Sequence, residues 1–285
     1  MPIEEYVLAS ILTEVAPAKA DPVAIGRLFE VQAIVARTYA AANLGRHAAE
    51  GFDLCATTHC QLVDPRRRAT SSWRTPAERA VARTAGVVLV HDGRPVQAVF
   101  HADCGGHTSA AADVWGGAPR PYLRAQRDDL PAGASHQTWR FEATANDLAA
   151  ALNRETRTSA GARLSAIEIG GRDAAGRVLN LRLRGTRETT VRAEDFRGAV
   201  TRVFGARSLR SAWFDVRRAR DRFVFEGRGF GHGVGLCQTG AQARATQGAT
   251  ALAILSFYYP GTDARVTRPV PARTPRRAFG LERSR

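Results

Sequence analysis

Five glycines occupy every second position from Gly227 to Gly235, and this spacing constrains the fold more than any other feature of the chain. Side chains of an extended strand alternate between its two faces, so an extended segment here would have one face without side chains. Such a face lets another backbone or a ligand approach closely. The spacing does not match the Gly-x-Gly-x-x-Gly fingerprint of dinucleotide-binding proteins. The sequence therefore predicts a strand that forms the floor of a binding cleft.

Two helices are predicted near the start of the chain. Residues 3–15 carry apolar side chains at every fourth position, and a second periodic segment covers residues 23–42. Glu14 lies at the end of the first helix, beside its apolar face. Partial burial there would raise its pKa, because desolvation disfavours the charged carboxylate. Judged only by its residue type, Glu14 is more typical of a solvated helix surface.

Helices and strands alternate irregularly along the rest of the chain. A hairpin is predicted over residues 86–101, with its turn at Asp92-Gly93, and a helix over residues 238–259, with a break at Gly248. We expect an α+β fold of two lobes around a cleft, the smaller lobe being inserted in the main one. The expected division is a main lobe of residues 1–135 and 227–265, a smaller lobe of residues 136–226, and a disordered basic tail of residues 266–285.

The cysteines and histidines suggest two chemistries. Two imidazoles and two thiolates form the ligand set of a closed tetrahedral zinc site, and they would come from His47, Cys55, His59 and Cys60. Their spacing is not that of a zinc finger, so a pair of buried thiols or a short Cys55–Cys60 disulfide remains an alternative. Cys104, flanked by two histidines, would suit a nucleophile of a cysteine peptidase. A buried, inert thiol is the more frequent case for such a residue.

The charge of the chain favours polyanionic partners. The formal net charge is +14, and arginine supplies nearly all of the positive charge. The arginines are spread along the chain without a nucleic-acid-binding motif, so we do not expect nucleic acid as a partner. No apolar run reaches the roughly 18 residues that a membrane-spanning helix needs. The sequence starts without a visible signal peptide.

Four sequence blocks resemble the SpoIID/LytB family of bacterial cell-wall proteins, in that family's order. They comprise Ile3–Glu14 with Val31–Ala40, Cys55–Gln61, Phe100–Thr108 with Val114-Trp115, and Gly227–Gln238. The resemblance extends over most of the chain up to about Gly261. It implies a lytic transglycosylase that cleaves peptidoglycan glycan strands stripped of stem peptides, with Glu14 as the catalytic acid. It also implies structural zinc at Cys55, His59 and Cys60, with His47 as the least certain fourth ligand.

The same resemblance extends to substrate, partners and location. The residues expected to bind the glycan are Arg37, Tyr39, His101, His232 and Gln238. For Arg37 the alternative is a structural ion pair, with Glu14 as the suggested partner. The main alternative function is a non-catalytic wall binder that enhances a cell-wall amidase, and the third is a peptidase using Cys104. The expected location is outside the cytoplasm, in the periplasm or cell wall, which would make the present start of the sequence incomplete.

Overall fold

The computed structural model describes residues 1–17, 20–130 and 135–267. Helices and strands both contribute throughout this part of the chain, which confirms the expected mixture of α and β structure. The hydrophobic side chains form two separate buried clusters, called here the first and the second cluster. Every helix among the described residues is too short or too polar to cross a bilayer. The predicted disordered tail falls largely on residues 268–285, which lie outside the described residues.

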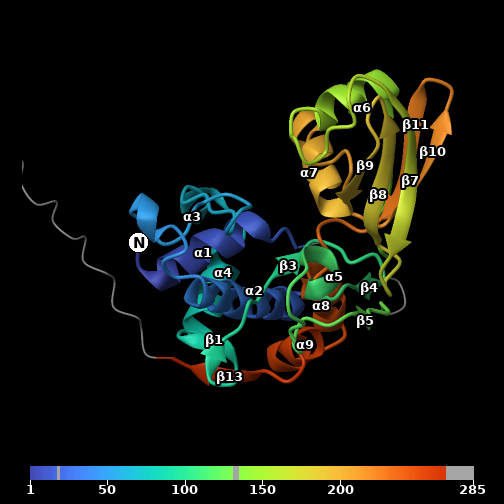
Figure 1. The fold of residues 1–285 in the computed structure, drawn as a ribbon. Helices are drawn as coiled ribbons and strands as arrows, with labels where there is room; N and C mark the ends of the chain where they lie inside the picture. Colours follow the sequence, from blue (N-terminus) through green and yellow to red (C-terminus); the bar gives the residue numbers. More distant parts are fainter. Residues whose placement is uncertain (18–19, 131–134, 268–285) are drawn as a thin grey trace, which may run out of the picture.

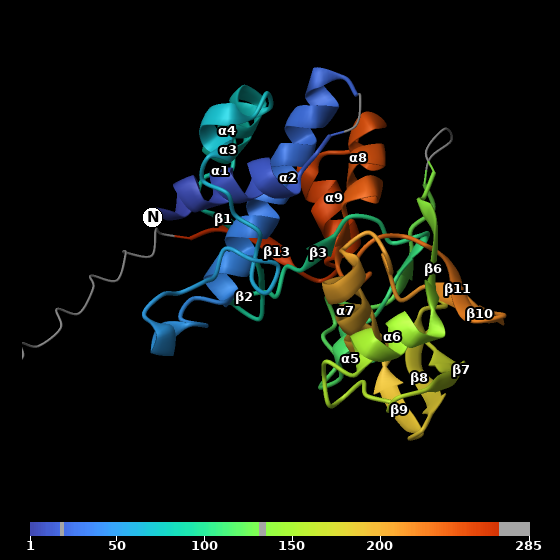
Figure 2. The ribbon, with the colours of Figure 1, turned by 90° about the horizontal axis from the view of Figure 1, so that it is seen from above.

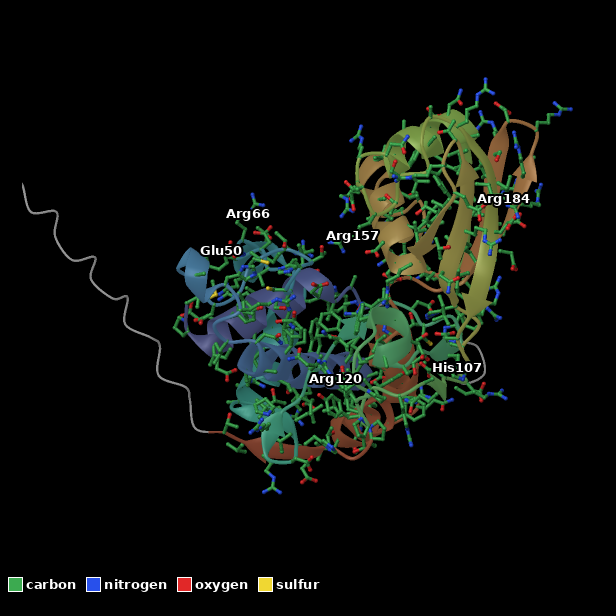
Figure 3. The ribbon with its side chains drawn as sticks, viewed as in Figure 1. Glu50, Arg66, His107, Arg120, Arg157 and Arg184 are labelled. Atoms are coloured by element: carbon green, nitrogen blue, oxygen red, sulfur yellow. The ribbon has the colours of Figure 1, made fainter. Side chains whose placement is uncertain are left out.

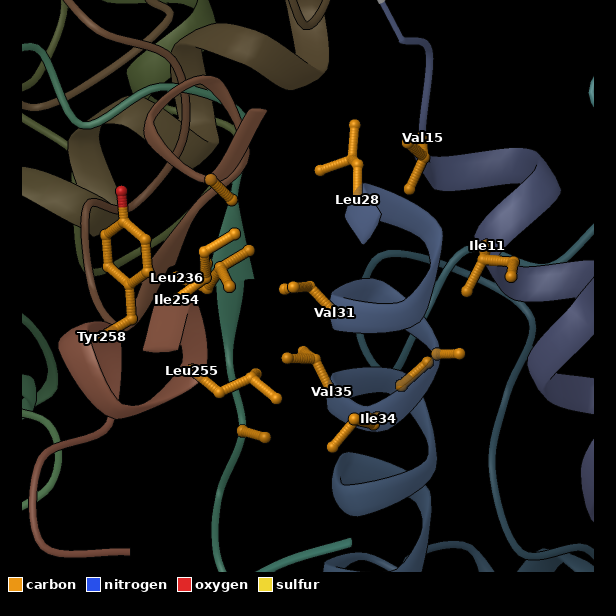
Figure 4. Close-up of a cluster of buried hydrophobic side chains, with 14 of the residues drawn as sticks. Ile11, Val15, Leu28, Val31, Ile34, Val35, Leu236, Ile254, Leu255 and Tyr258 are labelled. Carbon is orange, nitrogen blue, oxygen red and sulfur yellow. The ribbon is translucent and has the colours of Figure 1, made fainter. Parts of the chain in front are cut away.

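The first cluster is built around helix α2, and α1, α2, α8 and α9 lie close to where the sequence predicts helices, whereas α3, α4 and α5 were not predicted. Asp21 caps α2, because its Oδ1 atom accepts hydrogen bonds from the backbone N–H groups of Val23 (2.9 Å) and Ala24 (3.0 Å). Figure 4 shows side chains of α1, α2 and α9 meeting in this cluster, together with Leu236. The helices are α1 (Ile3–Glu14), α2 (Pro22–Ala42), α3 (Arg67–Thr70), α4 (Arg74–Arg83), α5 (Ala111–Trp115), α8 (Gln238–Thr246) and α9 (Ala251–Tyr258).

A three-stranded sheet lies beside these helices and corrects part of the hairpin prediction. Its order is β13 (Asp263–Val266), β1 (Val87–His91) and β2 (Arg94–Pro95). The turn is where the sequence places it, and both Asp92 and Gly93 have positive φ. The second strand, however, is only two residues long. The chain then leaves the sheet, and β3 (Phe100–His101) pairs in parallel with β12 (Leu236–Cys237).

The second cluster draws its buried residues from the segment between Trp139 and Phe225. Figures 1 and 2 show its elements gathered together, away from α1 and α4. Two antiparallel sheets, β10-β11-β6 and β7-β8-β9, enclose the cluster together with α6 and α7. Their bounds are β6 (Thr138–Thr144), α6 (Ala145–Leu152), β7 (Leu164–Arg172), β8 (Val178–Gly185), β9 (Thr189–Arg192), α7 (Ala193–Phe204), β10 (Phe214–Ala219) and β11 (Arg222–Arg228).

The glycine run does not form the predicted strand. Strand β11 ends at Arg228, and Gly229, Gly231, Gly233 and Gly235 all have positive φ, which an extended strand does not permit. A Cβ atom at Gly233 would lie 2.0 Å from Nε of Arg177, and one at Gly235 would lie 2.2 Å from the carbonyl oxygen of Val99. The glycines therefore serve close packing within the protein, and the run is not a bare floor for a ligand.

Candidate functional site

Glu14 is the last residue of α1 and has the environment of a general acid. Its side chain is partly buried, and burial raises its pKa. The backbone N–H of Leu62 donates a hydrogen bond of 2.8 Å to Glu14 Oε1, which opposes part of that rise. Within the described part of the chain no basic side chain forms an ion pair with Glu14. The protonated, uncharged form of this carboxyl is therefore favoured more than in an exposed glutamate.

Residues 60–64, called here the latch segment, form three hydrogen bonds with side chains of α1. The Tyr6 hydroxyl donates to Gln61 Oε1 at 2.8 Å, and the Leu62 N–H binds Glu14. The Asp64 N–H donates to Thr13 Oγ1 at 3.0 Å. Tyr6 and Glu14 are two helical turns apart and therefore lie on the same side of α1. The latch segment thus fixes the carboxyl end of α1, where Glu14 lies.

Buried amides surround the same end of α1. The Gln238 Nε2 atom lies 3.4 Å from the backbone oxygen of Glu14 and 3.4 Å from Oε1 of Gln32. The structure therefore brings Gln238, a predicted glycan-binding residue, next to Glu14. The Nε2 atoms of Gln32 and Gln61 and the Ser10 hydroxyl are buried without a hydrogen-bond partner among the described residues. Unpaired buried donors are costly, so this polar group has unused capacity for water or a ligand.

The four predicted metal ligands converge on one point. One ligand atom from each of His47, Cys55, His59 and Cys60 lies within 4.8 Å of all the others. Cys60 Sγ lies 3.4 Å from His47 Nε2 and 3.8 Å from His59 Nδ1, and Cys55 Sγ lies 3.7 Å from His59 Nδ1. Two ligands of one tetrahedral zinc ion, a thiolate and an imidazole, stand about 3.6 Å apart. The donor set and its spacing therefore fit zinc.

The surroundings of these ligands also suit a metal. His47 Nδ1 lies 2.5 Å from Glu50 Oε1, so a carboxylate orients the ring whose other nitrogen faces Cys60. Figure 3 labels Glu50 on the segment that follows α2. The Thr57 hydroxyl is the first cause that lowers the pKa of Cys55, to about 5, which favours the thiolate that binds metals. All four cysteines lie in the described ranges and are free thiols, so the alternative disulfide is not formed.

Arg37 has the structural role that the sequence left as its alternative, but with a different partner. Its side chain is 2% exposed, and its guanidinium binds Glu4 (2.6 Å) rather than Glu14. It also donates to the carbonyl oxygens of Ala33, one turn earlier in α2, and of Val87. The bonds to Glu4 and Val87 tie α2 to α1 and β1. The prediction that Arg37 lies free in a substrate cleft is not supported by these contacts. Tyr39 is buried as well, and its hydroxyl accepts a hydrogen bond from Arg46.

His101 and His232 lie against each other, with ring centroids 5.4 Å apart. His101 is buried and binds the carbonyl oxygen of Val234 through Nδ1, while its Nε2 has no partner among the described residues. Burial lowers the pKa of both rings, that of His232 to about 4, so both are neutral at pH 7. The structure therefore brings these two predicted residues together as an uncharged pair.

Cys104 is sealed inside the protein. Its side chain is completely buried, and its thiol donates to Asp128 Oδ2 at 3.2 Å. The neighbouring Cys237 sulfur, burial and the charge of Asp128 all raise the pKa of Cys104. A nucleophilic cysteine must be accessible to the substrate and ionised to the thiolate. Cys104 is buried, and its raised pKa keeps it protonated. The geometry favours the inert-thiol reading of Cys104.

Tyr6, Gln32, Glu50, Gln61 and Leu62 were not predicted as part of the site. Most of their contacts join segments far apart in the sequence, and Leu62 acts through a backbone N–H that no side chain reveals. One signal was available, since Tyr6, Ser10 and Glu14 follow each other at four-residue steps on one side of a helix.

Known proteins resemble this chain along most of its length. A family model described as stage II sporulation protein (SpoIID) matches residues 1–91, and one described as a domain of unknown function (DUF8618) matches residues 131–235. The stage II sporulation protein D of Bacillus subtilis (strain 168) is 28% identical over 274 residues, which covers 92% of this chain and 74% of that protein. An uncharacterized protein of Brachyspira hyodysenteriae is 30% identical, covering 92% of this chain and 66% of that protein. The amidase enhancer of B. subtilis is 26% identical, and its matched part covers 82% of this chain but 37% of the enhancer.

Proposed function

Since this chain belongs to the SpoIID/LytB family, we propose that it is a lytic transglycosylase acting on the glycan strands of peptidoglycan, with Glu14 as its single acid and base. The observation that carries this proposal is the state of Glu14. Its carboxyl is partly buried, its pKa is raised by burial, and the Leu62 backbone N–H donates a hydrogen bond to it. A glycosidic oxygen needs a proton donor of this kind at near-neutral pH.

The reaction needs only one carboxyl group. Protonated Glu14 donates its proton to the glycosidic oxygen as the bond from that oxygen to C1 breaks. The resulting carboxylate then removes the proton from the C6 hydroxyl of the same sugar, and the C6 oxygen bonds to C1. The products are a 1,6-anhydro end and a new free hydroxyl end, and Glu14 is protonated again. Ordinary glycosidases use a second carboxylate, whereas here the nucleophile belongs to the substrate and is held close.

We further propose that the substrate lies in a cleft between the parts built on the first and second clusters. Gln238 contacts Glu14 at one side of this path, and His232, which pairs with His101, lies six residues before Gln238 on the same segment. Strands without stem peptides suit such a path best, because each peptide would have to point out of it. The charge of +14 favours residence on the anionic polymers of the wall, outside the cytoplasm.

Zinc held by His47, Cys55, His59 and Cys60 is proposed as a structural ion. Four protein ligands complete a tetrahedral shell and leave no position for substrate. Cys60 directly precedes Gln61 and Leu62 in the latch segment, which binds α1 beside Glu14. The ion would therefore stabilise the loop that holds the end of α1.

The test is an analysis of soluble products from purified protein and denuded glycan strands. Wild-type protein is expected to release fragments with 1,6-anhydro ends, and Glu14→Gln protein is expected to release them at least roughly a hundredfold more slowly. Fragments with reducing ends only would mean hydrolysis and a second, water-activating group. Equal release by both proteins would remove Glu14 from the reaction.

One observation favours a second candidate, namely the similarity to an amidase enhancer. In this alternative the protein binds the wall and stimulates a cell-wall amidase without cleaving glycan. Intact peptidoglycan, an amidase and this protein would then release more peptide than the amidase alone, and the Glu14→Gln variant would stimulate as well as wild type. Transglycosylase activity instead predicts that amidase treatment restores cleavage of intact wall, and only with Glu14 present.

A further inference from the structure

Trp115 is an exposed tryptophan with no role in either hydrophobic cluster. It is the last residue of α5 and is 43% exposed, whereas Trp139 is 6% exposed and belongs to the second cluster. Trp73 packs against the first cluster. Single exposed apolar side chains are common, so a ligand is indicated here only by how the position of this indole is fixed and by what lies beside it.

The position of Trp115 is fixed from several sides. Its ring centroid lies 5.0 Å from that of His232, with the ring planes at 54°. The guanidinium of Arg192 on β9 donates to the carbonyl oxygen of Val114 at 2.6 Å, so an element of the second cluster holds the residue before it. The backbone N–H of Gly116 binds Ala112 and closes the end of α5. Figures 1 and 2 both place α5 where the two groups of elements meet.

The segment from His232 to Gln238 contacts Trp115 at one end and Glu14 at the other. His232, against which Trp115 packs, precedes Gln238 by six positions, and Gln238 contacts the backbone oxygen of Glu14. Six residues extend over at most about 20 Å. A glycan strand bound with one bond at Glu14 would extend over several sugars, a length comparable with this span to Trp115.

We propose that Trp115 is a sugar-binding platform on which an N-acetylhexosamine ring of the glycan packs, an inference that rests on the proposed function. Pyranose rings present faces of C–H groups with hydroxyls at the rim, and an indole offers a flat apolar face with a polar N–H at its edge. His232 backs the indole as a neutral ring. Its Nδ1 accepts a hydrogen bond from the Val234 N–H, which fixes its orientation. Trp115 is thus a positioning residue that holds the strand in register with Glu14.

The experiment is a fluorescence titration of Glu14→Gln protein with the β-1,4-linked tetramer of N-acetylglucosamine. Trp115→Phe keeps an apolar ring, so it should retain most of the affinity but lose the ligand-dependent change in tryptophan emission. Trp115→Ala should weaken binding roughly two- to tenfold, the range of an aromatic contact. Trp73→Phe is the matched control and should keep both the affinity and the emission change.

The outcomes separate this proposal from the proposed function. Unchanged affinity in Trp115→Ala protein, or an emission change that persists in Trp115→Phe, refutes the platform while cleavage by Glu14 stands. Absence of tetramer binding in a protein whose wild type cleaves denuded strands also refutes it. If wild type neither binds nor cleaves glycan, the proposed function fails first. Loss of amidase stimulation with unchanged sugar affinity in Trp115→Ala would assign the indole to a protein partner and overturn the sugar platform.

Discussion

At the scale of single residues, Glu14 has an environment that favours its protonated form. We predict that Glu14→Gln lowers cleavage of denuded glycan by roughly 10²- to 10⁴-fold, the usual contribution of a general acid. Glutamine keeps the acceptor for the Leu62 N–H, so the fold around it should persist. Product release per hour, measured beside circular dichroism, separates a lost acid from a lost fold. Cleavage by the variant at the wild-type rate would contradict the assignment.

The raised pKa of Glu14 also predicts a pH dependence of stability. The folded protein binds this proton more tightly than the unfolded chain, whose glutamate titrates near about 4.3. The stabilisation of the fold by this proton is fully present below the pKa of the unfolded chain. It is lost as pH rises through the higher pKa that Glu14 has in the folded protein. At pH 7, Glu14→Gln should therefore be as stable as wild type or melt a few degrees higher. A clearly lower melting temperature at pH 7 would show that the carboxylate stabilises the fold.

The metal prediction is also decided by single residues. Protein purified without chelators should carry one zinc ion per chain, and Cys60→Ser should lose it and unfold at lower temperature. Cys104→Ser is the matched control, because it removes another buried thiol while leaving the four ligands intact. Elemental analysis and thermal melting give both readouts. Zinc-free wild type, or equal zinc in both variants, would argue against the site.

At the scale of elements, the latch segment links the cysteine and histidine loop to α1. The Leu62 N–H binds Glu14, and this hydrogen bond lowers the pKa of the Glu14 carboxyl. Leu62→Pro removes the N–H, so the pKa of Glu14 should rise further. The pH at which cleavage is lost on the alkaline side should therefore move higher. Leu62→Ala keeps the N–H and is the control. Zinc content measured in both variants shows whether the loop is intact. A pH profile that moves the other way, with zinc retained, would contradict the role of this hydrogen bond.

The elements also show what the sequence could predict and why the rest was out of reach. Helices α1, α2, α8 and α9 follow apolar periodicity and clear stop residues, so they were predicted closely. The prediction of a strand for the glycine run was wrong. The spacing of the glycines does not reveal that four of them have positive φ. Arg177 and Val99 pack so closely against Gly233 and Gly235 that no side chain fits there. Both neighbours are far from the glycine run in sequence, so the sequence could not reveal this packing.

At the scale of the whole molecule, the sequence located the candidate site better than it described its surroundings. Glu14 was named from the family resemblance and the four metal ligands from their residue types together with that resemblance, and the structure brings those four ligands together. The ion pair considered for Arg37 is present, but with Glu4 near the start of α1 and not with Glu14 at its end. Figure 3 shows the labelled arginines Arg66, Arg120, Arg157 and Arg184 on widely separated parts of the molecule, which agrees with their even spread along the chain.

The proposed function also makes a prediction about the substrate at the scale of the whole molecule. The proposed path between the two groups of elements would favour a bare strand over one with peptides. We predict that denuded glycan is cleaved faster than intact peptidoglycan and that prior amidase digestion removes most of the difference. Rates on the two substrates, with Cys104→Ala as an active control, provide the measurement. Equal rates on both substrates would mean that stem peptides do not hinder binding.

The most direct test of the central claim is the mass of the glycan fragments that purified protein releases from denuded strands. If Glu14 acts as the single acid and base, each new end is a 1,6-anhydro sugar, lighter by one water than a hydrolysed end, and Glu14→Gln protein releases such ends at least roughly a hundredfold more slowly. Hydrolysed ends, or fragments released equally by the variant, would contradict the account.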